Sequence, residues 1–180
     1  MKSISYLMTT ALFVGLVFFS AGIFWYQRTL VTGDMIAHDV AHLVSIFERI
    51  DKTCDITSFD YQKNPINFLN VRSFTGSEVG PMNLVYPDAW QGPYVQDNPS
   101  INGREYEIVR TKAGYFITPG TGVKLPNGKV IGTDIMLDEH ADIAAMARDE
   151  TMLMHKGKPL AIQININQSS FEGLVAEDII

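Results

Sequence analysis

The sequence contains no cluster of basic residues and is acidic overall. Lys and Arg number 14 against 20 Asp and Glu, which gives a net charge of −6. Binding to nucleic-acid phosphates requires concentrated Lys and Arg, so no nucleic-acid partner is expected. The chain has one cysteine, Cys54, which excludes an internal disulfide. We predict that Cys54 is a small buried or half-buried apolar residue.

Sequence motifs for catalysis are also missing. Gly-x-Ser-x-Gly does not occur, and the glycine-rich stretch 120–128 lacks the Gly-Lys-Ser/Thr ending of a phosphate-binding loop. His38 and His42 stand four residues apart in His-Asp-x-x-His, which is similar to the zinc-peptidase motif. Both fall on the helix face opposite the apolar residues, without an evident third ligand. We predict no enzymatic activity; a membrane-tethered metal hydrolase would need these histidines as ligands.

Charged residues are absent between Lys2 and Arg28. At about 1.5 Å per residue, a helix from Ile4 to Tyr26 is roughly 35 Å long, which is enough to cross a bilayer. We therefore predict that residues 1–28 form a transmembrane segment in the lipid bilayer of the inner (cytoplasmic) membrane. The expected orientation is a single pass, with the N-terminus inside and the C-terminal domain extracytoplasmic.

A cleaved signal peptide is the alternative interpretation of the same residues. Lys2 supplies a small basic region, and Ser20, Ala21 and Gly22 are small residues of the kind that a signal peptidase accepts. The apolar run is longer than the core of a usual signal peptide, and the helical pattern resumes soon after it. An uncleaved anchor is therefore the favoured expectation.

A second apolar pattern follows the uncharged run. Five apolar residues recur at steps of four and three, which is typical of one helix face. We call them the seam: Ile36, Val40, Leu43, Phe47 and Ile50. The pattern predicts a helix over 29–50 whose seam packs against the rest of the domain or against a neighbouring helix.

The remaining chain divides into three parts by its composition. Residues 51–95 are punctuated by Gly and Pro and predict loops, short helical turns and a brief strand around 69–74. Residues 104–135 predict β-hairpins, the first between runs 106–110 and 115–118 and a second, shorter one over 123–131. Residues 136–180 form a C-terminal extension, with a helix expected over 138–154 and an alternating strand over 160–167.

Several short motifs between residues 86 and 135 occur in a distinctive order. Trp90-Gln91-Gly92-Pro93-Tyr94 precedes Asn102-Gly103-Arg104-Glu105-Tyr106, and Tyr115-Phe116-Ile117-Thr118 then leads into a glycine loop that ends near Asp134-Ile135. This order is similar to the globular domain of major pseudopilins of type II secretion systems, in which a Trp-x-Gly-Pro-Tyr segment precedes an Asn-x-x-Tyr strand and a Phe-x-Ile strand.

The resemblance implies a fold class and a set of core residues. The expected class is α+β, with a long N-terminal helix, transmembrane and then amphipathic, packed on a small antiparallel sheet in a pilin-like domain over 29–135. The extra C-terminal helix and strand have no counterpart in the family. Beside the seam, we expect Trp90, Gly92, Pro93, Tyr94 and Tyr106 to be interaction or core residues, since large aromatic rings stabilise cores.

The chain also departs from the family pattern at two places. In the family, a short leader ends in Gly, is cut before a Phe, and is followed by a Glu at the fifth position of the mature chain. Here Gly15 lies within the apolar run and no Glu precedes Glu48, so no recognisable prepilin cleavage site is present and processing by a prepilin peptidase is not expected. The resemblance further implies a calcium site in the glycine loop. Of the aspartates that would hold calcium in the family, this chain keeps Asp134. We assign the nearby Asp138 carboxylate to the same calcium site, and no other cofactor is expected.

The functional expectation combines the membrane segment with the resemblance. It is a non-catalytic structural or assembly component of a type II secretion, pseudopilus-like apparatus, anchored in the membrane. The expected partners are the bilayer, further copies of the chain and other pseudopilin or secretion subunits. The alternative is a membrane-anchored extracytoplasmic binding or accessory protein that uses a pilin-like fold without polymerising.

Overall fold

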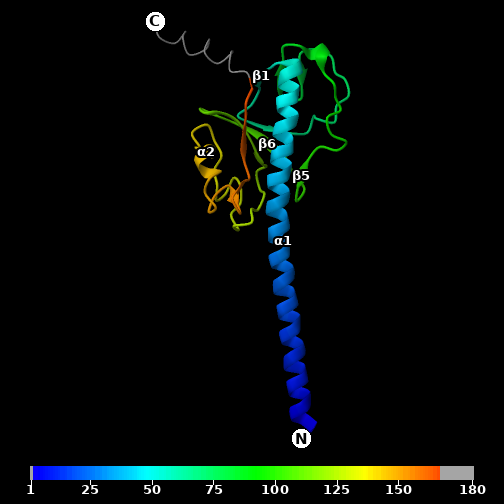
Figure 1. Ribbon diagram of the computed structural model, residues 1–180, viewed down its shortest axis with the longest axis vertical. Coiled ribbons are helices and arrows are strands. Elements are labelled where there is room, and N and C mark those ends of the chain that lie inside the picture. The colour runs from blue at the N-terminus through cyan, green and yellow to red at the C-terminus, as the bar shows by residue number, and fades with distance from the viewer. Residues whose placement is uncertain (1, 167–180) are drawn as a thin grey trace.

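The computed structural model describes residues 2–166, and within the first helix it describes the side chains of residues 12–20, 22 and 32–54. A single long helix, α1, is followed by a small α+β domain that packs against its C-terminal half (Figure 1). The elements are α1 (Lys2–Cys54), β1 (Ile56–Phe59), β2 (Lys63–Pro65), β3 (Glu78–Val79), β4 (Met82–Leu84), η1 (Pro87–Ala89), β5 (Ser100–Ile101), β6 (Arg104–Thr111), β7 (Gly114–Pro119), α2 (Ile143–Met146), β8 (Met154–His155), β9 (Lys158–Pro159) and β10 (Ile162–Ile164).

All strand pairs in these elements are antiparallel. The main sheet has the order β10-β7-β6-β2, with β5 pairing to β6, and a second sheet has the order β1-β4-β3. The strands β8 and β9 form a separate hairpin. The predicted α+β class with a small antiparallel sheet is therefore confirmed.

The end of α1 is fixed by one carboxylate. Asp55 adopts a left-handed conformation with φ of 55° and donates its N–H to the Asp51 carbonyl at 2.8 Å. Asp51 also accepts the Ile56 N–H through its side chain at 2.9 Å, although the residue is only 8% exposed. Because Asn and Asp tolerate the left-handed conformation that ends helices, this pair turns the chain directly into β1.

The five seam residues form the centre of the hydrophobic core. Each of them is at most 1% exposed, and the main sheet meets α1 through β7 and β10. Phe47 makes edge-on ring contacts with Phe59 and Phe68, at centroid distances of 6.1 and 6.2 Å. Phe59 in turn meets Tyr115 at 5.0 Å. The seam therefore packs against the chain's own sheets, which decides between the two partners that the sequence left open.

The hairpin of β6 and β7 agrees with the sequence prediction. Its register runs from Tyr106 opposite Pro119 to Thr111 opposite Gly114. Every residue of β7 after Gly114 is buried, so this strand is covered on both faces. The shorter hairpin predicted over 123–131 is reduced to a turn with one isolated bridge between Lys124 and Val130.

The prediction of loops over 51–95 is wrong in part. This segment contains the strands β1, β2, β3 and β4, and the strand expected around 69–74 is not among them. The expected short helical turn is present as η1. Each of these strands has two to four residues, which is too short to give a visible alternation of apolar and polar residues. Their pairing depends on contacts between distant residues, such as Ile56 with Leu84, that no local pattern encodes.

The helix predicted over 138–154 is also wrong, because only the single turn α2 forms. Three aspartates in this segment accept backbone N–H groups within three residues: Asp138 from His140, Asp142 from Ala145 and Asp149 from Thr151. The Asp138 and Asp149 bonds lie outside α2 and compete with helix formation, whereas Asp142 is the N-cap that starts α2 at Ile143. The strand predicted over 160–167 is present as β10, which pairs with β7; residue 167 lies outside the described residues.

Replacing a seam residue tests the packing of α1 on its own sheets. Leu43→Ala is expected to lower the free energy of unfolding by about 3 kcal/mol, because a fully buried side chain would leave a cavity. Urea unfolding of the full chain in detergent, followed by Trp fluorescence, measures the change.

The matched control is Glu48→Ala on the exposed face of the same helix, which is expected to change the stability by less than about 0.5 kcal/mol. A loss below 1 kcal/mol for Leu43→Ala would contradict burial of the seam within one chain.

Candidate functional site

The N-terminal part of α1 extends beyond the domain and carries an uncovered apolar surface (Figure 1). Every residue from 12 to 20 is exposed. The largest side chains remain mostly uncovered: Leu12 is 71%, Phe13 68%, Phe18 74% and Phe19 71% exposed. Since these positions complete about two helical turns, apolar groups point outwards all around the axis. This surface needs an apolar environment that the described part of the chain does not provide.

Among the described residues, no helix is both long enough and apolar enough to cross a membrane. The transmembrane segment predicted over 1–28 therefore stays a prediction. The choice between an anchor and a cleaved signal peptide is likewise untested.

The aromatic turn, residues 90–94, is held by the loop that precedes β3. The Trp90 indole donates to the Val71 carbonyl at 3.1 Å, and the Tyr94 N–H donates to the Leu69 carbonyl at 2.8 Å. A β-carbon at Gly92 would overlap both the Trp90 ring and the Val71 carbonyl, so only glycine fits there. The peptide bond between Gly92 and Pro93 is cis.

A series of rings joins this turn to α1. Trp90 meets Phe74 and Tyr94 in edge-on contacts at 5.4 and 4.8 Å, and the Arg49 guanidinium lies 5.0 Å from the Tyr94 ring centre. Burial raises the pKa of the Tyr94 hydroxyl. Trp90 and Tyr94 are half-buried, so both remain accessible at one edge.

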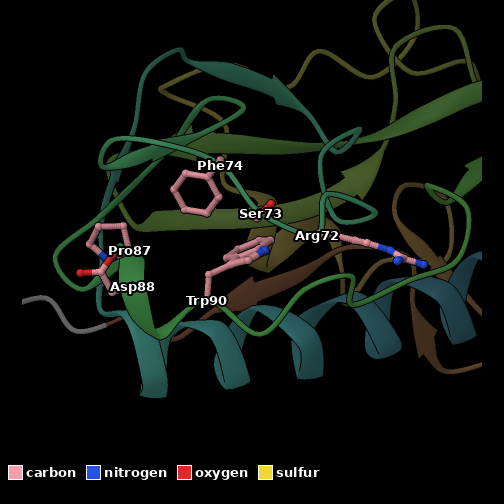
Figure 2. Close-up of a pocket in the computed structure, with 6 residues that line it drawn as sticks. All are labelled: Arg72, Ser73, Phe74, Pro87, Asp88 and Trp90. Carbon is pink, nitrogen blue, oxygen red and sulfur yellow. The ribbon is translucent and has the colours of Figure 1, made fainter.

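A small open pocket lies beside the aromatic turn. Its volume is about 170 Å³, and its lining residues are Arg72, Ser73, Phe74, Pro87, Asp88 and Trp90. Figure 2 shows the rings of Phe74 and Trp90 close to each other, whereas the Arg72 guanidinium extends away from them. The pocket offers two aromatic rings and one carboxylate, but no nucleophile paired with a base.

Tyr106 is fully buried and spans the space between β6 and α1. Its hydroxyl donates to the Asp39 carboxylate at 2.8 Å. Burial, and then this hydrogen bond, raises the pKa of Tyr106 far above its ordinary range. Asp39 is the acidic residue of His-Asp-x-x-His, so its carboxylate serves a structural contact in this fold.

His38 and His42 lie on the exposed side of α1, as expected from their position opposite the seam. Their rings are parallel to within 4°, with centroids 6.4 Å apart.

The two residues assigned to calcium are engaged in local turns. Asp134 accepts the Val130 N–H at 2.8 Å and Asp138 accepts the His140 N–H at 2.9 Å. Across the described residues, no group of three or more His, Cys, Asp or Glu is arranged to hold a metal ion. The calcium prediction therefore has no supporting cluster in this part of the chain.

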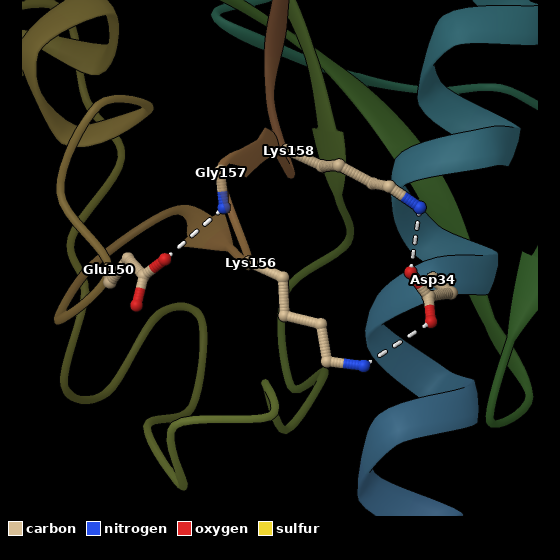
Figure 3. A network of polar contacts seen from close by, with 5 residues as sticks. All are labelled: Asp34, Glu150, Lys156, Gly157 and Lys158. Atoms are coloured by element: carbon tan, nitrogen blue, oxygen red, sulfur yellow. Dashed lines mark hydrogen bonds and ion pairs between the residues drawn. The ribbon is translucent and has the colours of Figure 1, made fainter.

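The hairpin of β8 and β9 contacts α1 at a site that the sequence analysis missed. Asp34 accepts a hydrogen bond from the Lys158 ammonium at 2.9 Å and lies 3.7 Å from that of Lys156 (Figure 3). On the other side of the hairpin, Glu150 accepts the Gly157 N–H at 3.2 Å. We call this contact the clasp, residues 33–34 and 154–159; it lies directly before the seam of α1.

Shape complementarity accompanies these charges. A β-carbon at Gly33 would overlap the imidazole of His155, whose Nε2 is buried and has no hydrogen-bond partner among the described residues. Exposed ion pairs contribute little to stability, so we assign most of the energy of the clasp to this close contact. A glycine inside a helical pattern was the one available signal in the sequence.

Comparison with known proteins identifies no matching family model, no related curated protein and no similar solved structure.

The contact between Gly33 and His155 predicts an unusual effect of alanine. Gly33→Ala is expected to lower the free energy of unfolding by about 1–3 kcal/mol through overpacking, although alanine normally favours a helix. Adding His155→Ala to this variant should restore part of the loss. Thermal unfolding followed by circular dichroism measures both.

Gly22→Ala in the same helix is the matched control, because nothing lies within 4 Å of a β-carbon at that position. Equal unfolding midpoints for the two single variants would refute the close contact at Gly33.

The charges of the clasp predict a dependence on pH. The hydrogen bond from Lys158, followed by the charges of Lys158 and Lys156, lowers the pKa of Asp34. The ionised Asp34 carboxylate therefore stabilises the folded state. This stabilisation is fully present above the ordinary carboxyl pKa near 4, and it is lost progressively as the pH falls through the lower pKa that Asp34 has in the folded state. Asp34→Asn should destabilise the protein at pH 7 and have little effect near pH 2.

Urea unfolding at the two pH values measures this difference. Asp97→Asn, at an exposed loop position, is the control and is expected to have little effect at pH 7. An Asp34→Asn effect that persists undiminished at the lower pH would show that the carboxylate charge is not its cause.

Proposed function

We propose that this chain is a membrane-anchored, non-catalytic structural subunit that assembles through its N-terminal helix as part of a type II secretion, pseudopilus-like apparatus. The observation that carries the proposal is the uncovered apolar surface of α1 over residues 12–19. The domain is the part that such an anchor would present outside the inner membrane.

The size of the apolar surface supports an anchoring role. Seven of its side chains are 46–74% exposed: Leu12, Phe13, Val14, Leu16, Val17, Phe18 and Phe19. Burying a side chain of this kind contributes about 1.5–3 kcal/mol, so removing these from water would contribute on the order of 10 kcal/mol. Because the side chains surround the axis, a bilayer or a bundle of helices covers them better than a groove on one side. The uncharged run of residues 3–27 has the length for the bilayer.

The arrangement of the domain supports the pilin-like part of the proposal. The C-terminal half of α1 lies across an antiparallel sheet, and the aromatic turn precedes β6 and β7, which lead into the glycine loop. This is the order of motifs on which the resemblance to major pseudopilins rests. The buried seam leaves the opposite face of α1, which includes Met35, His38 and Ser45, for contacts with neighbouring molecules.

A second candidate function is supported by the pocket beside the aromatic turn. In this alternative the chain is a membrane-anchored binding or accessory protein that does not polymerise. The open position of Phe74 and Trp90, next to the Asp88 carboxylate, would suit a ligand or a partner side chain (Figure 2).

Cysteine cross-linking in native membranes separates these functions. Single cysteines replace residues 12–19 in turn, while Cys54 remains because it is fully buried. We expect disulfide-linked dimers at a subset of positions with helical spacing, since neighbouring helices would meet along one face. Thr57→Cys, at an exposed position in β1, is the matched control and should remain monomeric.

Carbonate washing of the same membranes tests the anchor. Release of the chain by carbonate would overturn membrane anchoring. Retention without a cross-link at any of the positions would favour the anchored monomer over the assembling subunit.

A further inference from the structure

The two histidines of α1 share an exposed helix face that none of the contacts described above uses. Both His38 and His42 are exposed, their rings are parallel to within 4°, and the centroids are 6.4 Å apart. Residues four apart on a helix have β-carbons about 5–6 Å apart, so small side-chain rotations bring the two imidazoles towards a common point.

The backbone that carries this pair is held in place from the opposite side. Ile36, Val40 and Leu43 alternate with the histidines along α1 and are at most 1% exposed. A ligand pair on a rigid element loses little conformational freedom when it binds, which favours binding. Both rings are exposed in the described part of the chain, which leaves them room to rotate.

The imidazole nitrogens are available as ligands. Among the described residues, neither ring takes part in a hydrogen bond, and the contact that the structure records for them is the one between the two rings. The nearest carboxylates are engaged elsewhere: Asp39 accepts the Tyr106 hydroxyl, and Asp34 is bound by Lys158. The pair therefore offers two nitrogen ligands to an ion, and the neighbouring Asp39 carboxylate is not free to act as a general base.

Late first-row transition metals match this ligand set. Neutral imidazole suits Cu, Ni and Zn ions, whereas calcium and magnesium require oxygen ligands. Metal–nitrogen bonds of about 2.0–2.1 Å place the two nitrogens roughly 3.3 Å apart in a tetrahedral site, within reach of side chains one helical turn apart. Two protein ligands leave the other positions of the ion open to water.

We propose that His38 and His42 form a bidentate, non-catalytic site for a divalent transition-metal ion, with Cu²⁺ bound more tightly than Ni²⁺ or Zn²⁺. The site goes beyond the proposed function and does not depend on assembly or on the membrane. It also differs from a hydrolase site, because the carboxylate of the motif is held by Tyr106.

Calorimetric titration of the full chain in detergent with copper chloride, nickel chloride or zinc chloride tests this site. We expect one ion per chain, in the order of affinity given above. His38→Ala and His42→Ala should each weaken Cu²⁺ binding by about tenfold or more, since one ligand bond is lost. Circular dichroism confirms that these exposed substitutions leave the fold intact.

The matched control keeps the number of histidines and changes their spacing. In His42→Ala/Ser45→His, the two imidazoles stand on residues 38 and 45, about 10 Å apart along the axis, and cannot bind one ion together. This variant should bind as weakly as His42→Ala, and His140→Ala should bind like the wild type. If the spacing variant binds Cu²⁺ as tightly as the wild type, or if His140→Ala alone removes the binding, the proposal is overturned.

Discussion

Packing of the α1 seam on the chain's own sheets is the interaction on which the rest of the structure depends. It orients the helix, fixes β7 and β10 against it, and brings Phe59 and Phe68 against Phe47, while Tyr115 packs on Phe59. Because α1 is one continuous helix, this packing also directs its N-terminal part away from the domain (Figure 1). The side chains of residues 12–20 are exposed there, whereas the seam is buried against the sheets.

The boundary between these halves is reinforced from the far end of the sequence. The clasp brings the hairpin of β8 and β9 to Gly33 and Asp34, directly before the buried seam of α1. The close contact of His155 with a glycine adds dispersion energy that an ordinary side chain would prevent. Tyr106, through Asp39, adds a buried polar contact one turn further along the helix. These contacts hold the domain at a fixed place on α1, which an assembling subunit would need in order to present one constant surface to its neighbours.

The local features of the fold were predictable to the extent that they repeat with a regular period. The seam has a period near 3.5 residues, and the β6 and β7 runs alternate or are rich in β-branched and aromatic residues, so both appear in the sequence. The strands between Ile56 and Leu84 are too short to show a period. The segment 138–154 shows a helical spacing, but Asp138 and Asp149 accept backbone N–H groups in local turns on either side, and Asp142 caps the single helical turn between them. For the candidate site, the aromatic turn was visible as a motif, whereas the clasp was not.

The sequence by itself determined the uncharged run of residues 3–27, the apolar seam, the main hairpin and the spacing of His38 and His42, because each depends on residues that are neighbours along the chain. Only the tertiary structure decided that the seam faces its own sheets, that Asp39 is bound by Tyr106, and that Lys158 reaches Asp34 across 124 positions of sequence. The physical reason is the separation along the chain over which each interaction acts. Periodicity and turn chemistry act over a few residues, while burial and ion pairing depend on which distant segments the folded backbone brings together.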